Sequence, residues 1–232
     1  MAEILVIAPH PDDAELHAGG LIARHRQAGR SVVIADATAG ELGSRGDAAQ
    51  RLREAAEAAR LLGVERECLG LPDGGLSVAD REQRAVIVAA IRRHRPRVVI
   101  ALAEQARHPD HSALAGLVRQ AIKAAALHRL PAPGDHPAWD GARLIWVEAE
   151  LPLQPSALVP LDTACWASKM AAIRCYASQL AGGSGPPTSI SRPEFLEWIE
   201  ARGRVWGQMA GAPYAEAIVG AEPLLIGDLV GS

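Results

Sequence analysis

The sequence predicts an α/β fold, with a Rossmann-like, mainly parallel sheet that helices flank on both faces. Short apolar runs of strand length alternate with segments whose apolar residues recur at helical spacing, and this alternation is typical of parallel sheets. The composition agrees, because 49% of the 232 residues are hydrophobic while only 3% are aromatic. An aliphatic core of this kind is typical of strands buried on both faces. We expect residues 1–232 to form one domain, since this length is ordinary for one α/β core.

Four apolar runs predict the strands of this sheet, and a fifth segment could add a short strand at residues 66–71. Each of the four is flanked by polar or turn residues and lacks the alternation of a strand with one wet face. The clearest reads Val-Val-Ile-Ala-Leu. These four runs are residues 3–9, 31–37, 98–102 and 144–149.

Helical spacing and capping residues predict six helices between and after these strands. Leu16 and Leu21 belong to the periodic apolar set of the first, which can end at Gly29. Asp47 can cap the second helix and Gly63 can end it. The predicted helices cover residues 15–29, 47–62, 79–94, 112–127, 163–178 and 193–209.

Glycine- and proline-rich stretches predict the loops. Residues 38–46 are rich in glycine, and residues 71–75 read Leu-Pro-Asp-Gly-Gly, which is turn chemistry. Residues 128–141 read as a long loop. The segment 182–187 is a better candidate for a mobile lid than for a domain boundary.

Charge and cysteine usage exclude several classes of protein. The net charge of −3 gives no basic excess for binding nucleic acid. No apolar stretch approaches the roughly 20 residues that span a bilayer, and residues 1–8 lack the basic start of a signal peptide. The three cysteines, Cys68, Cys165 and Cys175, lack paired spacing and suit a reducing compartment. We therefore expect a cytoplasmic protein that binds neither membrane nor nucleic acid.

Two short segments that combine histidine and aspartate each follow a predicted strand. Residues 10–13 read His-Pro-Asp-Asp and residues 108–111 read His-Pro-Asp-His. Ligand sites in open parallel sheets form at the carboxyl ends of the strands, where both segments fall. Two histidines and one carboxylate leave an open position for water, as in catalytic zinc sites. Each segment alone could equally be a turn, but two such clusters at one end of the sheet favour a metal site.

These segments carry a resemblance to a known family, the LmbE-like, PIG-L family of zinc-dependent N-acetylglucosamine deacetylases. Within that family the chain most resembles the deacetylases of bacillithiol biosynthesis, which act on N-acetylglucosaminyl-malate. The resemblance runs in order over almost the whole chain. Its main motifs are residues 10–15 (HPDDAE), 38–46 (TAGELGSRG) and 108–111 (HPDH), with support from Arg51, 54–55, 71–73, 176–179, Gly211 and 214–216.

The resemblance implies that His10, Asp13 and His111 bind Zn²⁺, although Fe²⁺ or another divalent metal could occupy the same ligands. It also implies that Asp12 is the general base. The two neighbouring aspartates need different roles, because two free carboxylates so close would repel each other without a cation.

The family motif gives His108 and Asp110 catalytic roles beside the metal. His108 would stabilise the tetrahedral oxyanion or protonate the leaving amine. Asp110 would hold His108 in the right orientation, as carboxylates commonly do for histidines near a metal.

Arg51 and Arg107 are the candidates for substrate contact, because arginine can bind the carboxylates of a malate group through two hydrogen bonds. Without the resemblance, Arg51 would equally fit an exposed charge on a helix. Three residues depart from the family pattern. His17 stands where relatives have a small residue, and is either exposed or crowds the site. Gly74 stands in place of an arginine and Phe195 in place of a tyrosine. Both departures concern which substrate the site accepts, and not the type of reaction.

The predicted function is hydrolysis of the N-acetyl group of an N-acetylglucosamine conjugate, with a small glucosaminide as substrate. Hydrolysis of thiol-conjugate amides, or deacetylation of another N-acetylglucosaminide, is the alternative within the family. Two other classes stay open: a non-haem iron oxygenase, since two histidines and a carboxylate also describe that triad, and a sugar-binding module without chemistry. The resemblance also implies a homo-oligomer, a trimer or hexamer.

Overall fold

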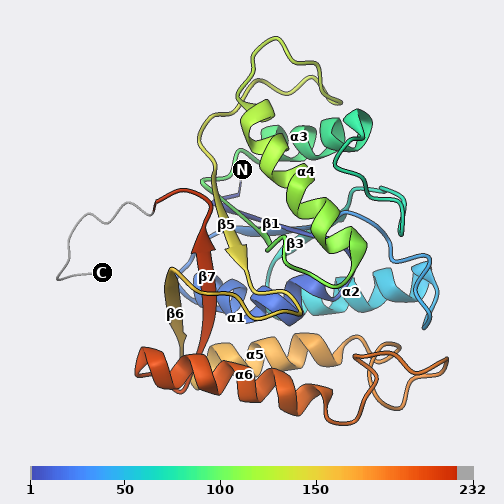
Figure 1. Cartoon of the computed structure of the whole chain (residues 1–232), viewed down its shortest axis with the longest axis vertical. Helices are drawn as coiled ribbons and strands as arrows, with labels where there is room; N and C mark the ends of the chain where they lie inside the picture. The colour runs from blue at the N-terminus through green and yellow to red at the C-terminus, as the bar shows by residue number, and fades with distance from the viewer. Residues whose placement is uncertain (1, 224–232) are drawn as a thin grey trace.

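The computed structural model describes residues 2–223, which form a seven-stranded sheet covered by helices on both sides (Figure 1). The strands are β1 (Ile4–Ala8), β2 (Val32–Asp36), β3 (Glu65–Cys68), β4 (Val98–Leu102), β5 (Arg143–Val147), β6 (Ala157–Leu161) and β7 (Tyr214–Gly220). The helices are α1 (Asp13–Gln27), α2 (Ala48–Leu62), α3 (Arg81–His94), α4 (Pro109–Ala125), α5 (Thr163–Arg174) and α6 (Phe195–Ala210). The predicted fold class is confirmed.

The strand order is β3-β2-β1-β4-β5-β7-β6, and the strands from β3 to β5 are parallel. From β1 the chain builds the sheet in one direction through β2 and β3, and then returns to place β4 on the other side of β1. This reversal leaves a crevice at the carboxyl ends of β1 and β4, the usual place for a ligand in such sheets. Both His/Asp segments begin there.

The prediction of only helices beyond residue 149 was wrong. Two further strands follow, and β7 runs antiparallel to both β5 and β6. β6 is an edge strand that contains Pro160, and a proline argues against a strand unless it lies at an edge. Its sequence therefore gives a weak strand signal.

Two aliphatic clusters form the core, one on each side of the sheet. Alternate residues of β1 point to opposite faces, so that Ile4 and Val6 join one cluster while Leu5 and Ile7 join the other. The first cluster includes residues of α1, α2, α5 and α6, and the second includes residues of α3 and α4. Figure 1 shows these two groups of helices on opposite sides of the sheet.

Helix α1 is held firmly to the C-terminal half of the chain. A Cβ atom on Gly20 would lie 2.3 Å from Cδ1 of Leu161, so only glycine allows this approach. Glu216 of β7 accepts hydrogen bonds from the backbone N–H of Gly20 and Leu21 and pairs with Lys169 of α5 at 2.6 Å. α1 carries the second aspartate of the first motif, so these contacts also position the site. Among residues 2–223, no helix has the length and apolar character to cross a membrane.

Candidate metal centre

Asp12 and Asp13 lie where β1 passes into α1. Asp12 has φ of 113°, a conformation that non-glycine residues seldom adopt and that costs free energy. It occupies the N-cap position of α1, but its carboxylate makes no capping hydrogen bond. At this strained turn each of the two carboxylates meets a different set of partners.

Asp13 brings the two histidine segments together. Its Oδ2 lies 3.1 Å from Nδ1 of His10 and 3.2 Å from Nε2 of His111. All three side chains are buried. Burial lowers the pKa of each histidine, but contacts with carboxylates outweigh it. Asp13 and Asp73 raise the pKa of His10 to about 11, and Asp13 and Glu150 raise that of His111 to about 10. The same histidines hold the pKa of Asp13 well below its usual value, against the effect of burial.

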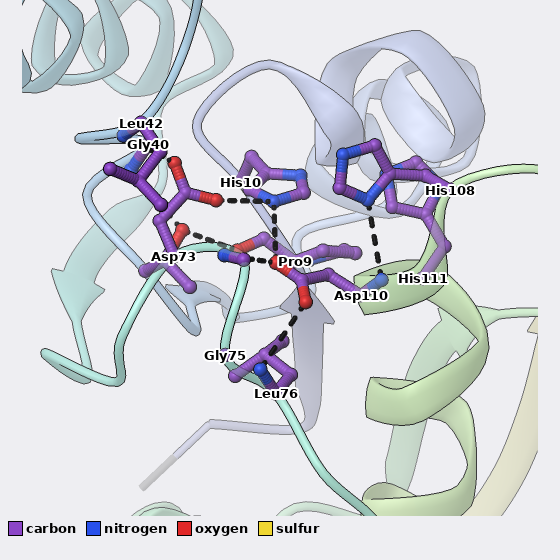
Figure 2. Close-up of polar contacts among 12 residues, drawn as sticks. Pro9, His10, Gly40, Leu42, Asp73, Gly75, Leu76, His108, Asp110 and His111 are labelled. Atoms are coloured by element: carbon purple, nitrogen blue, oxygen red, sulfur yellow. Dashed lines mark hydrogen bonds and ion pairs between the residues drawn. The ribbon is translucent and has the colours of Figure 1, made fainter.

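The second ring nitrogen of His10 also faces carboxylates. Its Nε2 lies 3.1 Å from Oδ1 of Asp73 and 3.3 Å from Oδ2 of Asp110, as Figure 2 shows. Asp73 also accepts a hydrogen bond from the backbone N–H of Leu42, which ties the loop at residues 38–46 to this histidine. Sequence reasoning gave Asp73 no role in the site, although its Leu-Pro-Asp turn belongs to the family pattern.

The carboxylate of Asp110 does not orient His108, contrary to the expectation from the family motif. It accepts hydrogen bonds from the backbone N–H of Gly74, at 2.7 Å, and of Leu76, at 3.2 Å. It also contacts His10, and Figure 2 shows the contacts with Leu76 and His10. The reason is that α4 begins at Pro109, earlier than predicted, so Asp110 lies in its first turn and points toward the loop at residues 73–76.

His108 is the exposed member of the histidine group and caps α4. Its Nδ1 accepts a hydrogen bond from the backbone N–H of Asp110 at 3.2 Å. Its ring centroid lies 4.8 Å from that of His10 and 5.0 Å from that of His111. Burial and the two neighbouring histidines lower the pKa of His108.

His111 has a carboxylate on its outer side as well. Its Nδ1 lies 3.0 Å from Oε1 of Glu150, although the two groups are not aligned as a hydrogen bond. Burial raises the pKa of Glu150, but the contact with His111 outweighs this and lowers it to about 2. The backbone N–H of Arg107 donates to the other oxygen of Glu150, while the side chain of Arg107 is exposed. Glu150 was missed because a lone glutamate after a strand gives no sequence signal.

Arg51 is buried, so the interpretation as an exposed charge on a helix is wrong. Its guanidinium donates to the backbone carbonyl groups of Pro11 and Gly40, at 2.6 and 3.3 Å, and lies 3.3 Å from Asp12. A Cβ on Gly40 would lie 2.2 Å from Nη1 of Arg51, and Gly40 has φ of 66°, so this position requires glycine. Arg51 therefore connects two family motifs, residues 10–15 and residues 38–46, to the carboxylate of Asp12.

A second arginine neutralises two acids beneath the site. Arg66 lies 2.5 Å from Oε1 of Glu15 and forms two contacts with Asp36, at 2.6 and 2.8 Å. All three side chains are buried, and burial raises the pKa of both acids while Arg66 opposes the increase. This ion-pair cluster stabilises the first turn of α1, which contains Glu15.

Two groups of three side chains in residues 2–223 are arranged as a cation site requires. Donor atoms of His10, His108 and His111 lie within 4.8 Å of one another, and so do those of His10, Asp73 and Asp110. Both groups share His10. The carboxylate of Asp13 lies between two members of the first group, so the site offers histidine nitrogen and carboxylate oxygen, the donors that zinc accepts.

Comparison with known proteins identifies the family of the chain and several relatives. A family model described as GlcNAc-PI de-N-acetylase matches residues 5–122, which include both His/Asp segments. A deacetylase of 1D-myo-inositol 2-acetamido-2-deoxy-alpha-D-glucopyranoside from Rhodococcus opacus (strain B4) is 33% identical over 181 residues, 63% of this chain. The match covers 61% of that relative, so the chain spans about three fifths of its length.

Two solved structures resemble nearly the whole chain. A conserved protein from Thermus thermophilus is 41% identical, with 97% of each chain covered and a TM-score of 0.87. The N,N'-diacetylchitobiose deacetylase of Pyrococcus horikoshii, complexed with an inhibitor, is 25% identical, with a TM-score of 0.81. That match covers 94% of this chain and 84% of the Pyrococcus chain.

Proposed function

The chain belongs to the PIG-L family, and from this premise we propose that it is a metal-dependent deacetylase of an N-acetylglucosamine conjugate. The observation that carries the proposal is the arrangement around Asp13. One carboxylate oxygen meets a nitrogen of His10 and a nitrogen of His111, and the outer nitrogen of each histidine faces another carboxylate. Histidines that bind metals are commonly held by such outer carboxylates. Residues 1–232 would act as one deacetylase domain.

The proposed metal ligands are Nδ1 of His10, Oδ2 of Asp13 and Nε2 of His111. His108 is close enough to compete, but its Nδ1 is occupied by capping α4 and its ring is exposed. Three protein ligands leave a position for water. When bound there, zinc would lower the pKa of that water to about 7 and polarise the amide carbonyl. Fe²⁺ or another divalent ion could supply the same chemistry.

Asp12 is the proposed general base. Its carboxylate is buried next to Asp13, and burial raises its pKa to about 7, although Arg51 opposes the increase. A base with a pKa near the working pH can both accept a proton from water and pass it on. Arg51 keeps the carboxylate in place at 3.3 Å, so the base acts from a fixed position.

His108 is the proposed stabiliser of the oxyanion or proton donor to the leaving amine. Since its Nδ1 accepts a backbone hydrogen bond, the neutral ring carries its hydrogen on Nε2. That N–H is then free to donate to a group on the substrate. Asp110 would act on His10 rather than on His108, by accepting from Nε2.

The proposed substrate is an N-acetylglucosaminide, with the malate conjugate of bacillithiol biosynthesis as the narrower candidate. The hydrogen bonds of Arg51 to Pro11 and Gly40 leave it less free to bind a malate carboxylate. Arg107 is exposed beside His108 and remains the candidate for that contact. The Rhodococcus and Pyrococcus relatives carry the names of an inositol conjugate and of diacetylchitobiose.

A panel of four substrates tests the proposal: N-acetylglucosaminyl-malate, its inositol counterpart, diacetylchitobiose and an amide of a thiol conjugate. We expect acetate and free amine in equal amounts from at least one glucosaminide. Turnover of the thiol-conjugate amide alone would favour the alternative within the family. Release of acetate from none of the glucosaminides would reject the deacetylase.

Metal analysis after anaerobic purification separates this reaction from iron-dependent oxidation. We expect chelation to abolish amide hydrolysis and Zn²⁺ to restore it without oxygen. Activity that needs iron and oxygen would reverse the proposal. A sugar-binding module without chemistry would bind glucosaminides and release no acetate under any metal.

A homo-oligomer, a trimer or hexamer, is proposed as the working assembly in the cytoplasm. Its support is the outer side of α6, where Trp198, Val205 and Met209 are 51%, 56% and 66% exposed. Large apolar residues one and two turns apart on one helix favour a protein contact. Light scattering on the purified chain measures the mass directly, and a monomer at micromolar concentration would reject this proposal.

A further inference from the structure

His17 lies on α1 one turn after Asp13, and its ring centroid is 6.4 Å from that of His111. Its side chain is only 8% exposed, so it is not a surface residue of the helix. Its Nε2 lies 3.8 Å from Oδ1 of Asp13, and its ring stands at 81° to that of His111. The sequence left open whether this histidine was exposed or crowded the site, and the structure has it buried beside a proposed ligand.

The two oxygens of Asp13 face different groups. Oδ2 receives the contacts of His10 and His111, where the metal would bind. No hydrogen bond to Oδ1 is found among residues 2–223, and Nε2 of His17 lies 3.8 Å from it. A carboxylate ligand is usually held by a hydrogen bond to a neighbouring donor. Nε2 of His17 is placed near enough to give Oδ1 that donor.

His17 borders a small cavity lined by both polar and apolar side chains. The other lining groups include the ion pair of Lys169 with Glu216 and the indole of Trp166. The indole N–H of Trp166 is buried and has no partner in the part of the chain that the structure describes. Ordered water can bind to polar groups in a cavity of this kind.

We propose that His17 is a positioning residue that holds Asp13 for the metal by donating its Nε2–H to Oδ1. The inference rests on the proposed ligand set of the preceding section. A shift of less than about 1 Å brings the two atoms from 3.8 Å into hydrogen-bond range. With Oδ1 held in this way, Oδ2 stays directed at the two histidine nitrogens.

Two substitutions separate this role from simple packing. His17→Leu keeps a side chain of similar bulk and removes the donor, while His17→Gln keeps a donor that can reach a residue four positions earlier on a helix. His25→Ala is the matched control, because His25 lies two turns further along α1 and bonds only the backbone carbonyl of Leu21. Circular dichroism of the metal-free proteins checks that each variant folds.

The measurement is the affinity for Zn²⁺, determined by competition with a chelator at one pH. We expect His17→Leu to weaken zinc binding by about 10- to 100-fold, the usual effect of losing a group that orients a ligand. His17→Gln should stay within a few fold of the wild type, and His25→Ala should match it.

Zinc affinity of His17→Leu within twofold of the wild type would overturn the inference. Equal losses in His17→Leu and His17→Gln would also overturn it, because the donor would then not matter. A wild-type chain that binds zinc no better than His10→Ala would reject the proposed ligand set itself. The two failures are therefore distinguishable without an activity assay.

Discussion

The guanidinium of Arg51 lies 3.3 Å from the carboxylate of Asp12, and both side chains are buried. Arg51 also donates to the carbonyl groups of Pro11 and Gly40, so its position is set by the two loops that border the site. This contact makes Arg51 a partner of the proposed base, whereas the sequence suggested a contact with substrate.

Replacing Arg51 should lower stability, because it leaves the buried carboxylate of Asp12 without a partner. We expect Arg51→Met to reduce the free energy of unfolding by about 3–5 kcal/mol, measured by urea denaturation. Arg53→Met, an exposed position on the same helix, should stay within about 0.5 kcal/mol. An Arg51→Met protein of normal stability that loses activity only on anionic conjugates would indicate that Arg51 contacts the substrate.

Replacing Asp12 should remove the base and leave the metal in place. We expect Asp12→Asn to lower kcat by at least about 10²-fold, with zinc content unchanged. Asp135→Asn is a matched control, since Asp135 is an exposed aspartate that also has a positive φ. Full activity of Asp12→Asn would mean that another group accepts the proton.

Replacing His108 tests whether this residue binds the metal or takes part in catalysis. We expect His108→Ala to lower kcat by about 10²- to 10³-fold, the usual loss when one donor to an oxyanion is removed, while zinc affinity stays near the wild-type value. His10→Ala, measured in parallel, should lose zinc. If His108→Ala loses zinc to the same degree, the metal is bound by the three histidines.

Replacing Gly20 tests how much the close packing of α1 against the C-terminal half of the chain contributes to stability. Alanine favours helix by about 1 kcal/mol over glycine, but its Cβ would lie 2.3 Å from Leu161. We expect overpacking to dominate, so that Gly20→Ala lowers the free energy of unfolding by about 1–3 kcal/mol. Gly19→Ala should cost less, because its Cβ would lie 2.9 Å from the nearest atom, Cγ of Lys169, rather than 2.3 Å. A higher melting temperature for Gly20→Ala would contradict this account.

The meeting of the two histidine segments could be predicted from the sequence. His10 and Asp110 are 100 residues apart in the chain and 3.3 Å apart in the structure. Each segment follows a strand of a parallel sheet, and the carboxyl ends of parallel strands share one edge. The rule that places ligand sites at this edge therefore sufficed to bring them together.

The partners of these residues could not be predicted in the same way. Whether Asp110 faces His108 or His10 depends on the residue at which α4 begins, and helix boundaries are the least certain part of a sequence-based assignment. Asp73 and Glu150 are single acids in loops, and only the folded chain brings them to the histidines. The edge strand β6 was missed for a local reason, since Pro160 weakens its pattern.

Arg45 holds in place residues 182–187, the loop that the sequence suggested as a lid, and the residues just before it. Its guanidinium donates to the carbonyl groups of Ser178, Leu180, Gly183 and Pro186. Opening residues 182–187 breaks two of these hydrogen bonds, those to Gly183 and Pro186, at a cost of about 3 kcal/mol. The open form then amounts to a fraction on the order of 10⁻² of the molecules. Amide hydrogens along this segment should therefore exchange about 10²-fold more slowly than those of an unrestrained loop.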